Sequence, residues 1–140
     1  DETMAMFEIA VVIASACLGA MLFISAAVAP TVFQALPEED AGRFLRAVFP
    51  KYFLINGGLA LLAGVIAYGS IEGVILAICG LTMLAVRYFA IPVINDARDA
   101  MLAGDESAGR KFAYWHRVTV LLNLGQILAL VTAIALLLGR

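Results

Sequence analysis

Residues Ile9 to Ala29 read IAVVIASACLGAMLFISAAVA, a run of 21 residues without a charged side chain. At about 1.5 Å of rise per residue, a helix of this length crosses the hydrocarbon layer of a bilayer, which is about 30 Å thick. A secretory signal peptide would carry a basic leader and a shorter apolar core, whereas Asp1, Glu2 and Glu8 precede this run. The run therefore predicts a transmembrane helix that stays in the mature protein.

The overall composition points to the same surroundings. Of the 140 residues, 64% are hydrophobic and 14% are charged, whereas soluble domains average about 45–50% apolar and about 25% charged residues. The formal net charge of −2 leaves no positive excess to hold a polyanion, so we expect no nucleic-acid partner. At this length we expect a single domain, residues 1–140, whose main partner is the lipid bilayer.

Three further apolar runs follow the first one. Phe53 to Gly69 is separated from the next run by a tight turn at residues 70–73, which predicts a transmembrane hairpin. The third run, Val74 to Ile94, contains Pro92, so we expect a kink there and a helix that projects beyond the bilayer. Val118 to Leu138 is the fourth run. Together the runs predict an all-α integral membrane four-helix bundle.

The connection between the first two spans has a different pattern. Pro37 to Tyr52 (PEEDAGRFLRAVFPKY) mixes acidic and basic residues with apolar ones. Phe44, Leu45, Val48 and Phe49 fall on one face at helical spacing. This segment predicts a short amphipathic helix that lies at the membrane surface.

Basic side chains are distributed unevenly between the two sides of the predicted bundle. Arg87 lies within a span and is left aside. Seven other basic residues lie in the first and third connections: Arg43, Arg46, Lys51, Arg98, Arg110, Lys111 and Arg117. Only Arg140 lies on the opposite side. The positive-inside rule then places both long connections in the cytoplasm and both termini outside it. We therefore expect a multi-pass protein of the inner (plasma) membrane.

Small residues spaced four apart occur on three of the spans. Because lipid is as apolar as leucine, helices in a bilayer associate through close packing of such small residues. We expect these faces to meet inside the bundle, and we expect the protein to form a homo-oligomer. The residues are Ser15 and Gly19, Ala60 and Gly64, and Gly125, Ala129 and Ala133.

Polar side chains inside the spans are the candidate site. Each costs about 2.5–3.5 kcal/mol on insertion scales if it is uncompensated, so each needs a reason. On the fourth span, polar residues follow the spacing i, i+3, i+7, i+10, which predicts one stripe: His116, Thr119, Asn123 and Gln126. We expect this stripe to meet Arg87 and Asn56 in a polar vestibule open to the cytoplasm, and these six are the predicted ligand-binding residues.

A structural interpretation of the same residues stays open. Arg87 could extend past Tyr88 to the lipid headgroups, and His116 could anchor the start of the last span. The amides could form hydrogen bonds between helices, worth about 0.6 kcal/mol each. If so, Arg87 faces lipid at the rim; under the functional interpretation it faces the bundle.

Metal binding is a second open question. Two cysteine–methionine pairs with i, i+4 spacing lie at comparable depth on the first and third spans, and such ligands suit soft ions like Cu(I); the four are Cys17, Met21, Cys79 and Met83. They also serve as ordinary apolar core residues. Asp96 and Asp99, with Asp105 and Glu106 nearby, could hold a divalent cation or form a solvated helix face.

Nothing in the sequence indicates catalysis. It holds no paired nucleophile and base, no glycine-rich phosphate loop and no HExxH motif. The single histidine, His116, cannot supply two axial haem ligands within one chain. We therefore expect neither an enzyme nor a cofactor.

Three segments resemble a known family. They are VAPTVFQALPEEDAGRFLRAVFPKYF (Val28 to Phe53), the end of the third span around Pro92, and KFAYWHRVTVLLNLGQ (Lys111 to Gln126). Together they resemble the transmembrane protein 205-like family, also catalogued as domain of unknown function 4149. The last segment carries the most specific pattern: Phe112, His116, Thr119 in place of the usual serine, and Asn-Leu-Gly from Asn123.

The resemblance implies a four-span membrane fold. Through the animal member's association with cisplatin resistance, it also implies export or sequestration of a drug or metal complex, but it assigns no functional residues. We therefore expect a transporter or transport-associated protein for small solutes or for metal or drug complexes. The alternative is a structural or accessory membrane protein whose polar residues lock helices together or bind lipid headgroups.

Overall fold

The computed structural model describes residues 1–140 and consists of helices joined by short connections. Its elements are α1 (Glu2–Phe23), η1 (Ile24–Val28), α2 (Ala29–Ala35), α3 (Glu38–Ile66), α4 (Ile71–Ala85), η2 (Val86–Ala90), α5 (Ile91–Leu102) and α6 (Glu106–Leu138). Because consecutive elements continue one another, they form four long helices, each long and apolar enough to cross a membrane. This confirms the predicted all-α four-helix bundle and makes the chain a multi-pass membrane protein.

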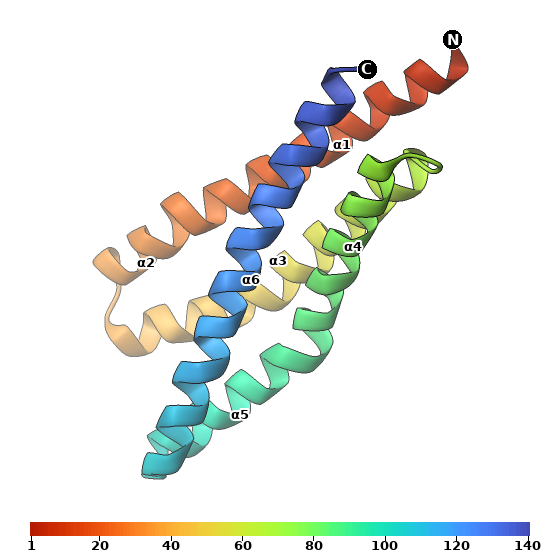
Figure 1. Cartoon of the computed structure of the whole chain (residues 1–140). Coiled ribbons are helices and arrows are strands. Elements are labelled where there is room, and N and C mark those ends of the chain that lie inside the picture. The colour runs from red at the N-terminus through yellow and green to blue at the C-terminus, as the bar shows by residue number, and fades with distance from the viewer.

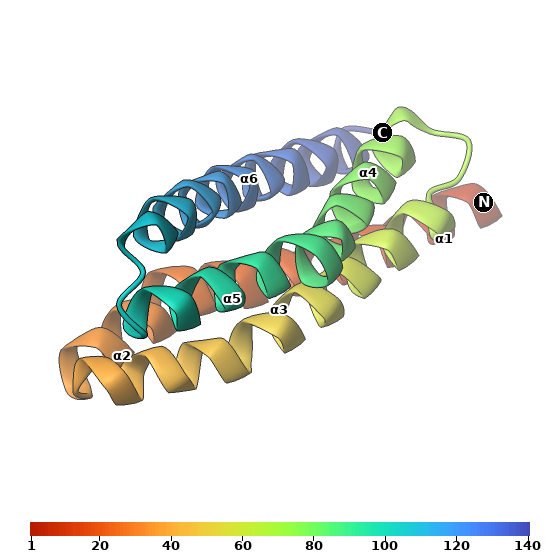
Figure 2. The ribbon, with the colours of Figure 1, turned by 90° about the horizontal axis from the view of Figure 1, so that it is seen from below.

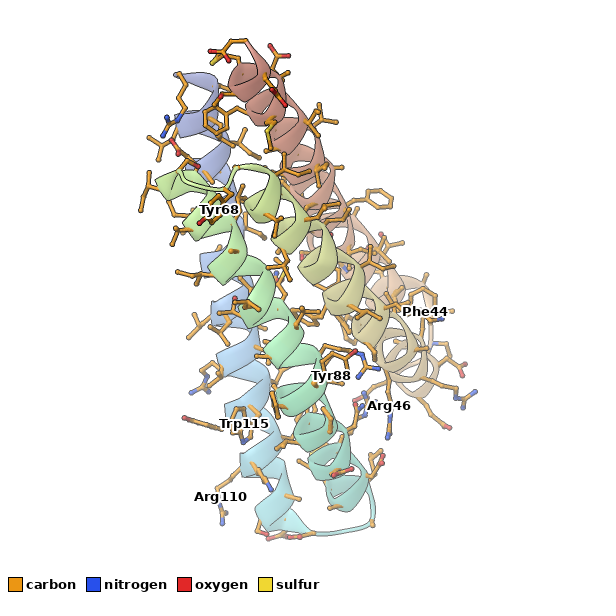
Figure 3. The ribbon with its side chains drawn as sticks, turned by 90° about the vertical axis from the view of Figure 1, so that its right-hand side faces the viewer. Phe44, Arg46, Tyr68, Tyr88, Arg110 and Trp115 are labelled. Atoms are coloured by element: carbon orange, nitrogen blue, oxygen red, sulfur yellow. The ribbon has the colours of Figure 1, made fainter.

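The four helices close into a ring. α1 and α4 each contact both α3 and α6. Both termini and the turn between α3 and α4 lie at one end of the bundle, and the connections α2–α3 and α5–α6 lie at the other (Figures 1 and 2). We call the second end the basic end, because Arg46 and Arg110 lie toward it, whereas Tyr68 lies nearer the opposite end (Figure 3).

Two of the long helices are interrupted by a π-helical turn, and in both cases a proline explains it. η1 ends two residues before Pro30, and η2 ends two residues before Pro92. A proline ring clashes with the carbonyl four residues back and offers no N–H to it. In each turn the residue before the proline donates to the carbonyl five positions back instead. The irregularity expected near Pro92 is therefore a π turn, and the ribbon bends there (Figure 1).

The predicted surface helix, Pro37 to Tyr52, is helical from Glu38 onward, but it is not a separate helix. It forms the first half of α3, which continues through Pro50 to Ile66. The three acidic residues in the first turn of α3 favour a helix start at this point. No glycine or capping residue separates the amphipathic half from the apolar half, so nothing ends the helix between them.

The closest helix pair is α3 with α4, and glycines make it possible. A Cβ added at Gly80 would lie 2.6 Å from the backbone nitrogen of Leu61, and one at Gly64 would lie 2.7 Å from that of Ala77. The backbones can approach this closely only because both positions lack a side chain. Ala60 and Gly64 thus pack inside the bundle as predicted.

The other predicted small-residue faces behave differently. Ser15, Gly19 and Gly125 are exposed on the outside of the bundle, and a Cβ added at either glycine would meet nothing within 4 Å. Spacing alone could not distinguish an inward face from an outward one, because small residues are common on both. Ala133 at the far end of the third stripe is buried.

The core is made of medium-sized apolar and sulfur-containing residues. The largest fully buried side chains are Met21, Leu76, Met83, Leu130 and Cys17. Large apolar side chains also cover the outside, such as Phe23, Phe89 and Leu128, each at least 60% exposed. An outer surface of this kind is stable against lipid tails rather than against water.

Candidate functional site

A cavity of about 380 Å³ opens among α1–α2, α3, α5 and α6 in the half of the bundle nearer the basic end. Its volume is at the small end of the range for ligand pockets. The polar residues that line it, besides Arg46, are Ser25, Asn95, Arg98, His116, Thr119 and Asn123. Aromatic and aliphatic side chains form the rest of the wall, among them Phe33, Phe49, Phe53, Ile91 and Ile94.

A hydrogen-bonded chain of three side chains limits the cavity at its inner end. The Tyr52 hydroxyl donates to Oδ1 of Asn123 at 2.6 Å, and Nδ2 of Asn123 donates to Oγ of Ser25 at 3.4 Å. Tyr52 is only 4% exposed and packs edge-on against Phe53. The chain joins α3, α6 and the π turn after α1. The π turn matters here, because it sets the direction in which Ser25 projects.

Three of the four predicted stripe residues on α6 do lie together on the cavity wall. His116 stacks on Phe112 with ring centroids 5.8 Å apart, and Thr119 donates to the carbonyl of His116 at 2.8 Å. Asn123 completes the set. At 100° per residue, positions i, i+3 and i+7 stay on one helix face. The sequence spacing therefore identified this wall of the cavity.

Gln126 and Asn56 lie outside the cavity. Gln126 lies about 15 Å along α6 from His116, beyond Asn123, the last residue of α6 in the lining, and its Nε2 donates to Thr82 on α4 at 3.1 Å. Asn56 is buried one turn beyond the cavity, with its Nδ2 donating to the Tyr52 carbonyl at 2.9 Å. Oδ1 of Asn56 and Oε1 of Gln126 are buried without a hydrogen-bond partner.

Arg87 does not join the predicted constellation either. Its guanidinium lies 5.1 Å from the ring centroid of Tyr88, an exposed side chain on the outside of the bundle. Arg87 lies in the π turn η2, where the wider turn changes the direction in which side chains project. Neither Arg87 nor Asn56 lines the cavity or hydrogen-bonds to a stripe residue, and Nε of Arg87 is buried without a hydrogen-bond partner.

Two other arginines contribute the positive charge of the cavity instead. Arg46 forms two hydrogen bonds to the carboxylate of Asp99, so its charge is balanced. Arg98 forms no ion pair and no hydrogen bond. It is half-buried, and its guanidinium covers Gly42 so closely that a Cβ added at this glycine would overlap it.

The sequence did not single out Arg98, Gly42 or Ser25 as site residues. Arg98 lies beyond the apolar run of its span, so the sequence places it among the charged residues of a connection. Its spacing does indicate which helix face it shares: Arg98 lies seven residues after Ile91 and four after Ile94, so the three side chains fall on one face. Which helix that face meets could not be read from the sequence.

The residues considered for metal binding serve other contacts. Sγ of Cys17 lies 3.9 Å from Sδ of Met21 and donates to the Asn56 carbonyl, and Sγ of Cys79 donates to the Gln126 carbonyl. All of them are buried in the apolar core. Asp99 pairs with Arg46, and Asp105 caps the start of α6. No group of three or more histidine, cysteine or acidic side chains is arranged to hold a metal ion.

The sequence matches the family described as "Domain of unknown function (DUF4149)" over residues 12–103. No curated protein matches, and no solved structure does. The matched range includes Ser25, Gly42 and Arg98 but ends before α6, so the resemblance of residues 111–126 to the transmembrane protein 205-like proteins stays a prediction. Because the match covers well over half of the sequence, the chain belongs to the DUF4149 family.

Proposed function

We propose that this membrane protein binds a small solute in the cavity at its basic end and acts in transport, as a transporter or as a transport-associated protein. The observation that carries the proposal is the cavity itself. It combines polar side chains, most of them on α5 and α6, with apolar side chains on α3 and α5, within the part of the chain long enough to cross a membrane. Half of the lining residues are hydrophobic and seven are polar or charged, and a concave site that combines apolar contact with polar groups is typical of small-molecule binding.

Polar groups at membrane depth support the same proposal. Such groups normally pair with each other or face a water-filled space. Here Ser25, Thr119 and Asn123 border the cavity in the middle of apolar helices. The uneven distribution of basic residues favours a basic end in the cytoplasm, with both termini on the other side of an inner (plasma) membrane. The cavity would then open toward the cytoplasm, and the protein would not act as an enzyme.

A homo-oligomer fits this proposal. Ser15, Gly19 and Gly125 leave small, outward-facing surfaces on α1 and α6 against which a second copy can pack closely. Chemical crosslinking in native membranes tests this directly.

The rival function, a structural or accessory role, has a specific observation in its favour. Two polar contacts connect helices across the bundle, Tyr52 with Asn123 and Gln126 with Thr82. Contacts of this kind stabilise a membrane bundle whether or not a ligand binds. The two functions therefore have to be separated by a measurement on the cavity.

The experiment uses proteoliposomes and three membrane-impermeant solutes with the same phenyl ring: benzenesulfonate, benzyltrimethylammonium and phenyl glucoside. We expect the protein to bind at least one of them and to speed its efflux. Thr119→Phe, which fills the cavity, should abolish both effects. Thr132→Phe is the matched control, because Thr132 is exposed on the same helix and lies outside the cavity.

The outcomes separate the two functions. Binding with efflux, both lost in Thr119→Phe, supports a transporter, and binding without efflux supports a transport-associated protein. If no solute binds, or if Thr132→Phe removes binding as fully as Thr119→Phe, the proposal fails and the structural role is favoured.

A further inference from the structure

The charge of the cavity wall is unbalanced. The lining contains two guanidinium groups, those of Arg46 and Arg98, and no carboxylate. Asp99 neutralises Arg46 from outside the lining through two hydrogen bonds. Its carboxylate makes no such contact with Arg98, which has no ion-pair partner in the structure. Asp99 also attracts Arg98 electrostatically, but the hydrogen-bond donors of Arg98 are unused and are available to a ligand at the cavity wall.

The guanidinium of Arg98 lies against a glycine. Arg98 lies over Gly42 on the neighbouring helix, where any side chain would displace the guanidinium. Gly42 is itself buried and also lines the cavity. A guanidinium that is half withdrawn from water and has no partner gains free energy when an anion accepts its hydrogen bonds. The absence of a side chain at Gly42 thus leaves room for the donor at the cavity wall.

The apolar part of the cavity defines the rest of the ligand. Phe49 and Phe53 on α3 and Ile91 and Ile94 on α5 line the same space as Arg98. These side chains offer van der Waals contact to a hydrocarbon or aromatic body but no hydrogen bonds. A small inorganic anion would leave this wall unused, and a neutral hydrocarbon would leave the guanidinium unpaired.

We infer that the solute of this cavity is an amphipathic anion, with one carboxylate, sulfonate or phosphate group held by Arg98 and an apolar body on the α3 and α5 wall. This inference rests on the proposed function, because it names the class of solute for the same cavity. The anion could be a free molecule or the headgroup of an anionic lipid, since both present the same chemistry to a guanidinium.

The test measures equilibrium binding of the same three phenyl compounds to the protein in nanodiscs of phosphatidylcholine. We expect benzenesulfonate to bind at least about tenfold more tightly than the cation or the neutral glucoside, a difference of about 1.4 kcal/mol. Arg98→Gln should remove this preference, and Gly42→Ala should weaken it because the added Cβ displaces the guanidinium. Arg110→Gln is the control, because Arg110 is exposed and lies outside the cavity lining.

Two results would overturn the inference. One is binding of the cation or the glucoside that is as tight as the binding of benzenesulfonate. The other is an unchanged preference for benzenesulfonate in Arg98→Gln, when this variant has the same melting temperature as Arg110→Gln. In both cases a solute still binds in the cavity, so the proposed function survives while the anion inference fails. If none of the three compounds binds, both fail together.

A second arm identifies the source of the anion. Native mass spectrometry of the protein from nanodiscs containing phosphatidylglycerol counts retained anionic lipid. Retention that falls in Arg98→Gln but not in Arg110→Gln supports an anionic site filled by a lipid headgroup. Benzenesulfonate binding that is unaffected by phosphatidylglycerol supports an anionic site for a free solute.

Discussion

The hydroxyl of Tyr52 donates to Oδ1 of Asn123 at 2.6 Å, although the two residues are 71 positions apart in the chain. The bond joins α3 to α6 and limits the cavity at its inner end. Tyr52 is buried, so its hydroxyl depends on a protein partner rather than on water. The same contact therefore holds two helices together and shapes the candidate site.

Removing this hydroxyl should destabilise the bundle. Tyr52→Phe leaves Oδ1 of Asn123 without its donor, and interhelical hydrogen bonds in membranes are worth about 0.6 kcal/mol on average and about 1.7 kcal/mol at most. We expect a loss of unfolding free energy in this range, measured by steric trapping in bicelles. Tyr68→Phe is the matched control, since Tyr68 is 91% exposed. An equal loss in both variants would show that the bond contributes nothing.

The α3–α4 packing makes a second prediction. Gly80→Ala places a methyl group 2.6 Å from the nitrogen of Leu61 and 2.7 Å from the carbonyl oxygen of Gly57, so the two backbones must separate. Overpacking of this kind costs about 1–3 kcal/mol. Gly58→Ala provides the comparison, because its Cβ meets nothing within 4 Å. A melting temperature that falls only in Gly80→Ala is expected, and a fall of the same size in Gly58→Ala would refute the close contact.

The start of α6 should depend on pH. Hydrogen bonds from the Ser107 hydroxyl and from the backbone N–H groups of Ser107 and Ala108 lower the pKa of Asp105. Because the folded-state pKa is the lower one, this stabilisation is present above the ordinary aspartate pKa of about 3.9 and is lost as pH falls through the folded-state value. We expect hydrogen-exchange protection in the first turn of α6 to fall in that acidic window.

The control for this prediction is Asp105→Asn. Asparagine caps a helix about as well as aspartate, but it has no proton to gain. Its protection should therefore stay constant across the window in which the parent protein loses it. Loss of protection at the same pH in both proteins would assign the effect to another group.

The number of spans and the helical wall of the site were predictable from the sequence. An apolar run such as Ile9 to Ala29 forms a helix in a bilayer, because only a helix makes all the backbone hydrogen bonds of a single segment within that segment. His116, Thr119 and Asn123 share a face because α6 is regular over that stretch. Both predictions depend only on local periodicity.

The rest of the site depends on features that the spacing of residues along one segment does not determine. The π turns before Pro30 and Pro92 change the helical phase, so Ser25 faces the cavity and Arg87 faces Tyr88. The partnership of Arg98 with Gly42 depends on which helices are neighbours. Neighbour relations of this kind follow from packing of the whole bundle, not from any one segment.

The most direct test of the account asks whether the cavity is open to water from the basic end. The measurement compares Ser25→Cys, on the cavity wall, with Ser15→Cys, on the outer surface of α1, for reaction with a charged thiosulfonate in inside-out membrane vesicles. The native cysteines, Cys17 and Cys79, are buried and should not react with the reagent. The account predicts that only Ser25→Cys reacts and that benzenesulfonate slows its reaction. No reaction at Ser25→Cys from either side of the membrane, or equal reaction at Ser15→Cys, would contradict it.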